Sequence, residues 1–494
     1  MLLWLLDYLA GTAAEPALAG LAKITMRAAL AAMASFLVAV LLGPGLIGWL
    51  RARFREPILS DSAAVRRLHS YKAATPTMGG LFIVAGLLGA TCLLADPGNR
   101  LVQAALLLVV GLALIGAADD LVKLRGRRNG LSVRGKLAGQ LVVATLVAVL
   151  VWEHHRHLPD GLTLALPLWG QVGNLGAAFI PLAVLVLVAS SNAVNLTDGL
   201  DGLAGGCLIF TTAAVTAVTY AAGHAEMAQY LAIPRIPGAG ELTVPAAALV
   251  GGVLGFLWFN CHPAQVFMGD TGALPLGGLL GLLALAARQE WLLVVAGGVF
   301  VAEAGSVILQ VGSFKLRRRR IFRCAPLHHH FQLAGWPEGK IVVRFWIAGA
   351  LCALAGLAAL KLNIDEKAGR HPPARPAGAV VRELPPSPPH TFATGRLARP
   401  GAVVRGLPRR PNYQSPLLPA LEAAATSRGN SGRLCSLSLL TTAPAGQARR
   451  WPFVQPQTWV QQPGRCPGLE QPRVLGPNGS PHRVAAAPFA TSHP

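Results

Sequence analysis

The chain has 494 residues, of which 53% are hydrophobic and 13% are charged, and its mean hydropathy is +0.49. This composition is too apolar for a soluble protein of that length, so it excludes an ordinary soluble domain. The net charge of +21 would suit a nucleic-acid-binding protein, but roughly 13 of these charges lie beyond residue 366 and the others stand in short loops between apolar runs. We therefore expect a membrane protein with no nucleic acid partner.

Ten apolar runs are long enough to cross a hydrocarbon core of about 30 Å. They lie at 24–50, 77–95, 101–118, 136–152, 175–192, 200–221, 243–259, 272–287, 291–312 and 341–362. The sequence therefore predicts an all-α polytopic membrane protein with about ten transmembrane helices.

The loops between these runs differ in charge from one side to the other. Loops 51–76, 119–135, 193–199, 260–271 and 313–340 fall on the same side and hold roughly 19 Lys and Arg residues, against roughly four in the opposite loops. The positive-inside rule places that side in the cytoplasm. Nearly all of the unusual polar clusters also lie there, which predicts one active site at the cytoplasmic face. A transporter or channel would instead place polar residues near mid-membrane.

Two adjacent carboxylates, Asp119 and Asp120, end the third apolar run and are followed by Lys123. Carboxylates at a membrane boundary are costly unless they meet a cation or a proton, so a functional role is favoured over an ordinary hydrated loop. The next polar group, Asn195, Asp198 and Asp201, lies in a glycine-rich segment. Helix packing alone would explain those glycines but not the three polar side chains.

Asp270 stands just before another apolar run, and Phe267 precedes it. Separated carboxylates without a Cys/His pattern favour a hard cation such as Mg²⁺ over zinc. Phe267 could stack on a nucleobase or belong to the core. Three consecutive histidines, 328–330, follow an arginine-rich stretch and suit a polyanionic substrate, although topology explains the arginines better than substrate binding does.

After Lys361 the sequence changes to Pro, Arg, Ala and Gly without periodicity, and roughly 22 of the 37 prolines lie beyond residue 366. We expect an integral membrane domain over 1–363. The segment 364–494 is expected to be a disordered or anomalous extension.

Five strings, taken together, resemble the bacterial phospho-N-acetylmuramoyl-pentapeptide transferase (MraY) family, within the polyprenyl-phosphate N-acetylhexosamine-1-phosphate transferase superfamily. They are HSYKAATPTMGG, IGAADDLVK, NLTDGLDGLAGG, VFMGDTGALPLGG and APLHHHFQ followed by GWPEGKIVVRFWI. The resemblance covers about residues 20–362. It implies a Mg²⁺-dependent enzyme of peptidoglycan synthesis in the bacterial inner (plasma) membrane, among membrane lipid, and commonly a homodimer. The enzyme would transfer phospho-MurNAc-pentapeptide from UDP-MurNAc-pentapeptide to undecaprenyl phosphate, giving lipid I and UMP.

The resemblance also implies residue roles. Asp119 would be the base or positioning group for the lipid phosphate, with Asp120 beside it, and Asp270 would bind Mg²⁺. Asn195 and Asp198 would line the nucleotide-sugar region, while Asp201 and Phe267 resemble a uracil-binding pair. The remaining polar pocket would comprise Lys72, Thr77, Lys123, Lys136, His328, His329 and His330, with His329 among the catalytic residues.

The chain departs from the family pattern at Gln332, where Glu is usual, and in its length beyond residue 362. The nearest rival function is transfer of GlcNAc-1-phosphate from UDP-N-acetylglucosamine by a related enzyme. That enzyme would share the carboxylate motifs and differ in the histidine region.

Overall fold

The computed structural model describes residues 1–4, 19–53, 75–125, 130–166 and 170–368 of the chain. All of these belong to one compact unit, Met1–Leu384. Lys72 and nearly all of the predicted extension lie outside the described residues. The last described helix continues past the predicted boundary at residue 363 and ends at Ala368.

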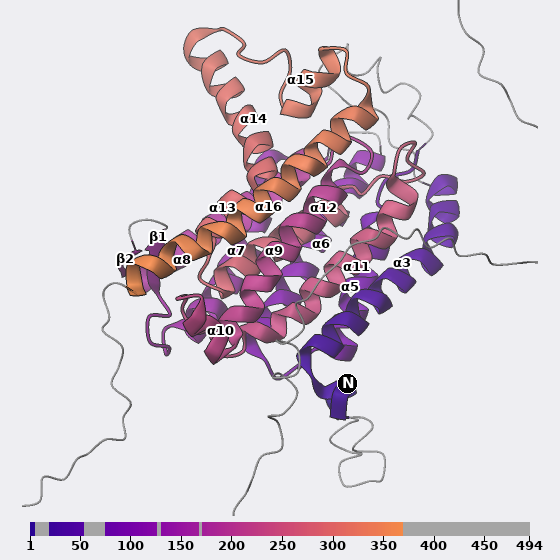
Figure 1. Cartoon of the computed structure of the whole chain (residues 1–494). Coiled ribbons are helices and arrows are strands. Elements are labelled where there is room, and N and C mark those ends of the chain that lie inside the picture. The colour runs from indigo at the N-terminus through magenta and orange to yellow at the C-terminus, as the bar shows by residue number, and fades with distance from the viewer. Residues whose placement is uncertain (5–18, 54–74, 126–129, 167–169, 369–494) are drawn as a thin grey trace, which may run out of the picture. The chain divides into compact units, whose positions relative to one another are not determined.

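Helices account for almost all of the described chain (Figure 1). The main helices are α3 (Ile24–Arg53), α5 (Gly80–Leu94), α6 (Arg100–Leu124), α7 (Val133–His155), α8 (Phe179–Thr197), α9 (Leu203–Gly223), α11 (Thr243–Asn260), α12 (Asp270–Ala286), α14 (Gly298–Arg317) and α16 (Glu338–Ala368). In the described part of the chain, three short α-helices join them, namely α10 (Ala225–Tyr230), α13 (Glu290–Ala296) and α15 (Leu327–Leu333), together with short 3₁₀ turns at Ala19–Ala22, Gly176–Ala178 and Ala239–Leu242.

Eight of the described helices are long and apolar enough to span a membrane, and α5 and α12 are shorter apolar helices. These ten elements coincide with the ten predicted apolar runs, which confirms the all-helical polytopic class. The run predicted at 291–312 is divided at Gly297, where α13 ends and α14 begins.

A small β-hairpin between α7 and α8 was not predicted. Strands β1 (Thr163–Leu166) and β2 (Gly170–Asn174) pair antiparallel, with Thr163 opposite Asn174. Each strand is too short to leave a clear period-two pattern in a loop that contains prolines and glycines. We call the end of the helix bundle that carries this hairpin and α10 the hairpin end.

Helix α12 forms the centre of the bundle, and every one of its residues is buried. It packs against α6, α8 and α5, while α11 packs along α3. A helix that is apolar around its whole circumference is expected at such a position, because it has no face for solvent or headgroups. The first residue of this central helix is Asp270, so the fold places that carboxylate among three neighbouring helices.

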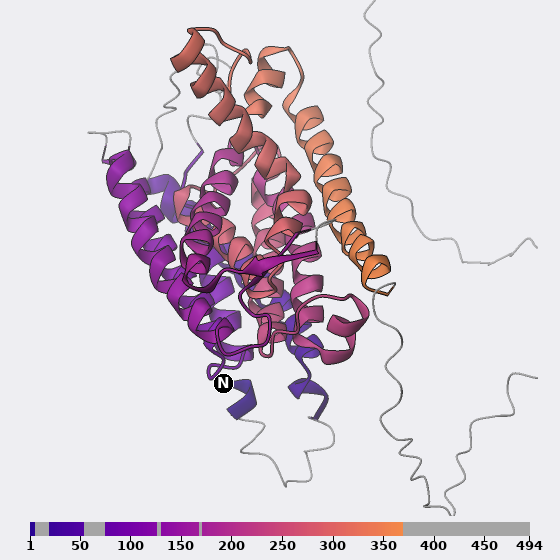
Figure 2. The same ribbon diagram turned by 90° about the vertical axis from the view of Figure 1, so that its left-hand side faces the viewer.

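At the end opposite the hairpin, α14 projects beyond the other helices and α15 lies near its tip (Figures 1 and 2). Helix α16 then returns along the bundle and packs against α9, α13 and α14. We call this the α15 end. The predicted polar clusters at the C-terminal end of α6, the C-terminal end of α8 and the N-terminal end of α12 belong to the same end.

Candidate active site

Three carboxylates and two lysines meet at the α15 end of the bundle. Lys123 Nζ lies 2.9 Å from Asp119 Oδ2, 3.4 Å from Asp120 Oδ1 and 3.1 Å from Asp270 Oδ2. Lys136 Nζ forms an ion pair with Asp270 Oδ2 and lies 3.7 Å from Asp119 Oδ2. The three carboxylates are buried. We call these five residues the carboxylate cluster; with all five groups ionised, one negative charge is left over.

Sequence spacing explains part of this arrangement. Asp119 and Asp120 lie one turn before Lys123 on α6, so an i,i+4 and an i,i+3 pair bring both carboxylates to the same amine. Lys136 stands in the first turn of α7, whose N-cap is Ser132. The Asp270 carboxylate comes from α12, and only the tertiary fold brings it to the lysines.

Asp120 fixes the beginning of α12. Its carboxylate accepts hydrogen bonds from the backbone N–H of Asp270 at 3.2 Å, from the backbone N–H of Thr271 at 2.9 Å and from the Thr271 hydroxyl at 2.7 Å. The first N–H groups of a helix have no partner within the helix, and an anion beside them is favourable. Asp120 therefore holds Asp270 in place through the backbone.

Two glycines allow this close approach. A methyl group at Gly116 of α6 would stand 2.2 Å from the carbonyl oxygen of Asp270, so no larger residue fits there. Gly269, just before α12, has a φ of +73° and lies against the Asp120 carboxylate and the Thr77 hydroxyl. Backbone hydrogen bonds from Gly79 to Phe267 and from Gly80 to Met268, both at 2.8 Å, join the segment around Thr77 to this turn.

The donor set of the cluster fits a hard divalent cation. One oxygen each from Asp119, Asp120 and Asp270 can be chosen so that all three lie within 4.8 Å of one another. The Thr77 hydroxyl beside them is buried and has no hydrogen-bond partner among the described residues. Carboxylate and hydroxyl oxygens are ligands that Mg²⁺ accepts, and an unpaired buried hydroxyl is costly unless something else binds it.

A second polar group surrounds Asp201. Its Oδ2 accepts hydrogen bonds from the backbone N–H of Ala264 at 3.1 Å and from His262 Nδ1 at 3.0 Å. Its own backbone N–H donates to Glu338 Oε1 at 2.9 Å. Asp201, His262 and Glu338 also bring one ligand atom each within 4.8 Å of one another. The segment 260–270 thus runs from Asp201 to the carboxylate cluster and carries the half-buried Phe267 between them.

Asn195 and Asp198 lie at the C-terminal end of α8, and both are half-buried. The backbone N–H of Asp198 donates to the carbonyl of Asn195 at 3.3 Å, so the chain turns here before Asp201. Helix α9 then begins after Gly202, which has a φ of +79°. The glycines of this segment serve that tight turn and the close packing of α9.

The three histidines face different surroundings. His328 is buried, and its Nδ1 lies 3.1 Å from Glu303 Oε2. His329 is half-buried, and its Nδ1 lies 2.8 Å from Gln332 Oε1. His330 Nδ1 accepts a hydrogen bond from the backbone N–H of Arg323 at 3.2 Å, so it fastens the arginine-rich loop to α15.

Of the predicted site residues, the structure brings Thr77, Lys136 and the α6 and α12 residues into one cluster. Asp198 and Asp201 share a turn with Asn195, and His328 reaches that turn at Gly199. Sequence reasoning missed His262, Glu338 and Glu303. Glu303 had a signal, because it is a single carboxylate inside an apolar run. His262 and Glu338 stand in segments that the sequence predicts to be polar loops, where their residue types are unremarkable.

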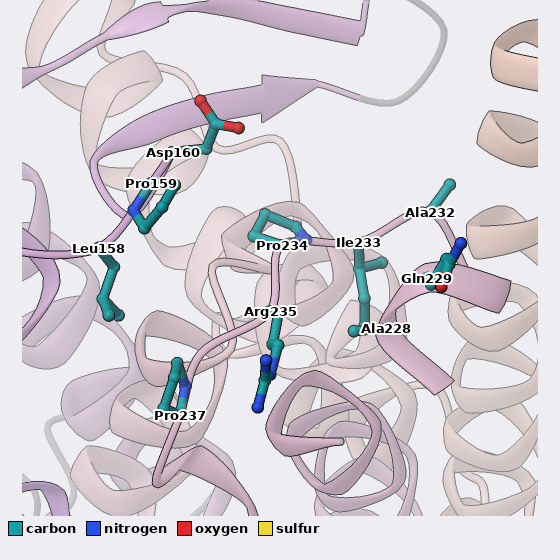
Figure 3. A pocket seen from close by; sticks show the side chains of 10 residues that line it. All are labelled: Leu158, Pro159, Asp160, Ala228, Gln229, Ala232, Ile233, Pro234, Arg235 and Pro237. Carbon is teal, nitrogen blue, oxygen red and sulfur yellow. The ribbon is translucent and has the colours of Figure 1, made fainter. Parts of the chain in front are cut away.

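A separate cavity of about 410 Å³ lies at the hairpin end (Figure 3). Leu158, Pro159 and Asp160 line it from the segment after α7. From α10 and the loop that follows, the lining residues are Ala228, Gln229, Ala232, Ile233, Pro234, Arg235 and Pro237. None of the predicted site residues lines this cavity. The carboxylate cluster is therefore the candidate active site.

Comparison with known proteins gives consistent matches. A family model described as Glycosyl transferase family 4 matches residues 102–288, which include the carboxylate cluster. Three relatives are each named phospho-N-acetylmuramoyl-pentapeptide-transferase: those of Koribacter versatilis (45% identical over 357 residues), Solidesulfovibrio magneticus (47% over 344) and Nitratidesulfovibrio vulgaris (49% over 345). Each alignment covers 69% of this chain and 94% of the relative.

Proposed function

Because this chain belongs to the family of phospho-N-acetylmuramoyl-pentapeptide transferases, we propose that it transfers phospho-MurNAc-pentapeptide from UDP-MurNAc-pentapeptide to undecaprenyl phosphate. The products are UMP and lipid I, the first membrane intermediate of peptidoglycan synthesis. The observation that carries the proposal is the carboxylate cluster at one end of a bundle of membrane-spanning helices. Such a site suits a reaction between one soluble and one lipid-borne phosphate.

The reaction exchanges one phosphorus–oxygen bond for another. An oxygen of the lipid phosphate attacks the β-phosphorus of the donor, and the bond from that phosphorus to the bridging oxygen breaks. The electron pair leaves with UMP. Phosphoryl transfer of this kind depends on positioning and on neutralising negative charge.

Asp270 would be the principal ligand of Mg²⁺, with Asp120 and the Thr77 hydroxyl beside it. When bound, the ion would supply positive charge that offsets the negative charge of the diphosphate and of the leaving UMP. The side chains of Lys123 and Lys136 bind phosphate oxygens from the same side. Asp120 keeps Asp270 in register through its hydrogen bonds to the start of α12.

Asp119 has the position of a group that orients the lipid phosphate or takes a proton from it. Its Oδ1 accepts the backbone N–H of Leu131 at 2.8 Å, which leaves Oδ2 to face the two lysines. A phosphate oxygen that binds those lysines therefore comes next to Asp119. General-base catalysis requires this kind of hydrogen-bond reach.

The donor nucleotide binds against two parts of the chain, the turn between α8 and α9 and the segment 260–270. Asn195 and Asp198 line its sugar and diphosphate, and Phe267 stacks on the uracil. Asp201 holds the backbone of the segment 260–270 in place by accepting a hydrogen bond from the Ala264 N–H. The turn that contains Asp201 lies beside the uracil. His329 and His330 complete the polar lining, while His328 lies beneath the turn. Lys72 lies outside the described residues, and we propose it as a further substrate-binding residue from the sequence alone.

The protein lies in a bacterial inner membrane, and its site faces the cytoplasm. The soluble donor is made in the cytoplasm. The support is the excess of lysine and arginine in the loops at the α15 end. We also propose that the enzyme is a homodimer in membrane lipid and that residues 1–363 form the transferase domain.

The direct test is reconstitution of the purified chain with undecaprenyl phosphate, Mg²⁺ and UDP-MurNAc-pentapeptide. Formation of UMP and of a lipid-linked diphosphate sugar in equal amounts is expected. Release of UMP without a lipid product would mean hydrolysis, and the proposal would be wrong.

A further inference from the structure

Glu303 is a carboxylate in the interior of the bundle that the mechanism above does not use. It lies on α14, inside a membrane-spanning segment, and its side chain is 0% exposed. Ionisable groups at such positions are costly and are therefore usually functional and paired. Its partner is His328 of α15, whose side chain is 1% exposed.

Both carboxylate oxygens of Glu303 bind the same residue. Oε1 accepts the backbone N–H of His328 at 3.2 Å, and Oε2 accepts the ring Nδ1–H at 3.1 Å. An ionised carboxylate can only accept hydrogen bonds, so this pairing places the proton on Nδ1 and fixes the orientation of the ring. Glu303 thereby sets the position of α15 as well as the tautomer of its first histidine.

The opposite edge of the ring presses on the donor-binding turn. A methyl group at Gly199 would stand 2.3 Å from His328 Nε2, so the ring and the backbone of Gly199 are in direct contact. His328 Nε2 is buried, and among the described residues it has no hydrogen-bond partner. No substrate group fits between the ring and the turn. The imidazole is a spacer between Glu303 and the segment that carries Asp198 and Asp201.

On the basis of the proposed function, we propose that Glu303 is a positioning residue for donor binding. Glu303 holds His328 against Gly199, and the His328 ring thereby fixes the conformation of residues Asp198–Asp201. Neither Glu303 nor His328 contacts the substrate. This assigns a role to Glu303 and changes the role of His328 from the substrate-binding one that the sequence suggested.

The ring of His329 connects the Glu303–His328 pair to the exposed side of the site. The His328 and His329 rings lie 4.2 Å apart between centroids, and His329 is bound to Gln332 on the other side. Movement of His328 would therefore displace His329 together with the turn. The two groups that His328 contacts, the turn at Gly199 and the ring of His329, both belong to the donor side of the site. Loss of Glu303 should therefore weaken donor binding more than it slows the chemical step.

Two substitutions separate the parts of this unit. Glu303→Gln keeps the shape of the side chain. In this variant the amide oxygen can still accept the backbone N–H of His328, and the amide NH₂ then donates to Nδ1. The ring proton must therefore move to Nε2, which faces Gly199. His328→Asn keeps a donor near Nδ1 for Glu303 but removes the edge of the ring that touches Gly199. Glu290→Gln is the matched control, because Glu290 is also buried and paired, with Arg288 at 3.1 Å, but sits beyond the hairpin end of α12.

Steady-state kinetics with UDP-MurNAc-pentapeptide, undecaprenyl phosphate and Mg²⁺ should be measured for the full chain, together with thermal unfolding in detergent. Glu303→Gln and His328→Asn should each raise KM for the donor about tenfold, with kcat within about threefold of wild type. The double variant should be no worse than either single variant, because the two residues act as one unit. Glu290→Gln should lower the melting temperature but leave KM for the donor unchanged.

The proposal is overturned if KM for the donor stays at the wild-type value in His328→Asn, or if the two effects multiply in the double variant. It is also overturned if the activity of Glu303→Gln and His328→Asn falls only in proportion to the loss of melting temperature. Glu290→Gln shows what that pattern looks like for a pair that serves stability alone. Failure of the wild-type chain to use UDP-MurNAc-pentapeptide would instead contradict the proposed function. The two failures are therefore distinguishable.

Discussion

The carboxylate of Asp120 caps the helix that Asp270 begins, accepting the backbone N–H of Asp270 at 3.2 Å and that of Thr271 at 2.9 Å. Asp120 thus supports the position of Asp270, while the Asp270 side chain points to Lys123 and Lys136. The two carboxylates lie in one cluster but make different contacts. Substitution of each should therefore give a different result.

Asp270→Asn should abolish turnover, by about a thousandfold or more, without unfolding the protein. The neutral amide keeps the volume of the side chain but weakens binding of a divalent cation. Activity should be titrated against Mg²⁺ after removal of metal with a chelator, and melting temperature should be measured in parallel. Wild-type turnover with an unchanged Mg²⁺ dependence would remove Asp270 from the mechanism.

Asp120→Asn should reduce both activity and stability. The amide has one acceptor oxygen in place of two, and its NH₂ group would face donors at the start of α12, so about 1–3 kcal/mol of unfolding free energy should be lost. Chemical or thermal unfolding of this variant and of Asp270→Asn provides the comparison. Equal stability of the two variants would contradict the capping role.

His329→Ala should lower turnover strongly and leave the melting temperature within a few degrees of the wild type. The ring is half-buried, and it contacts His328 and Gln332 of the same short helix, so its loss should cost little folding stability. Turnover and thermal unfolding should be recorded on the same detergent preparation. A parallel fall in both quantities would make His329 structural.

A chain that stops after Ala368 should retain wild-type activity. Every residue that we place in the site precedes that point, and Ala368 is where α16 ends. The specific activity of the truncated protein should be compared with that of the full chain at equal amounts of folded protein. Loss of turnover in a well-folded truncation would give residues 369–494 a function in catalysis.

Much of this fold follows from the sequence, because the bilayer imposes length and apolarity on each span. The ten apolar runs correspond to helices, and the polar ends of α6 and α12 could be recognised by their carboxylates. The β-hairpin at 163–174 was missed because short strands leave little pattern. The division of α13 from α14 at Gly297 was also missed, since apolarity continues across it.

The candidate site was less predictable than the fold. Sequence order can place Asp119 and Lys123 on one helix face, but it cannot show that Asp120 turns toward the N-terminus of α12. Nor can it show that Gly116 makes room for that approach. His328 resembled its two neighbours in sequence, and only its burial against Glu303 and Gly199 separates it from them. Long-range packing decides these differences.

The choice of donor tests the proposed reaction most directly. UDP-MurNAc-pentapeptide and UDP-N-acetylglucosamine share uridine and diphosphate. Asp201, Phe267 and Asp270, which we propose to bind those shared parts, therefore cannot discriminate between the two donors. Discrimination must come from groups that meet the lactyl-peptide arm, and α15 with His329, His330 and Gln332 is the candidate segment. A hundredfold preference needs only about 2.7 kcal/mol of differential transition-state binding, which one or two polar contacts can provide.

The measurement is the rate of UMP release and of lipid-linked product formation with each donor, at equal concentrations of undecaprenyl phosphate and Mg²⁺. We expect the chain to consume UDP-MurNAc-pentapeptide at least about a hundredfold faster than UDP-N-acetylglucosamine. Formation of lipid-linked N-acetylglucosamine, without any product from the muramoyl donor, would contradict this expectation.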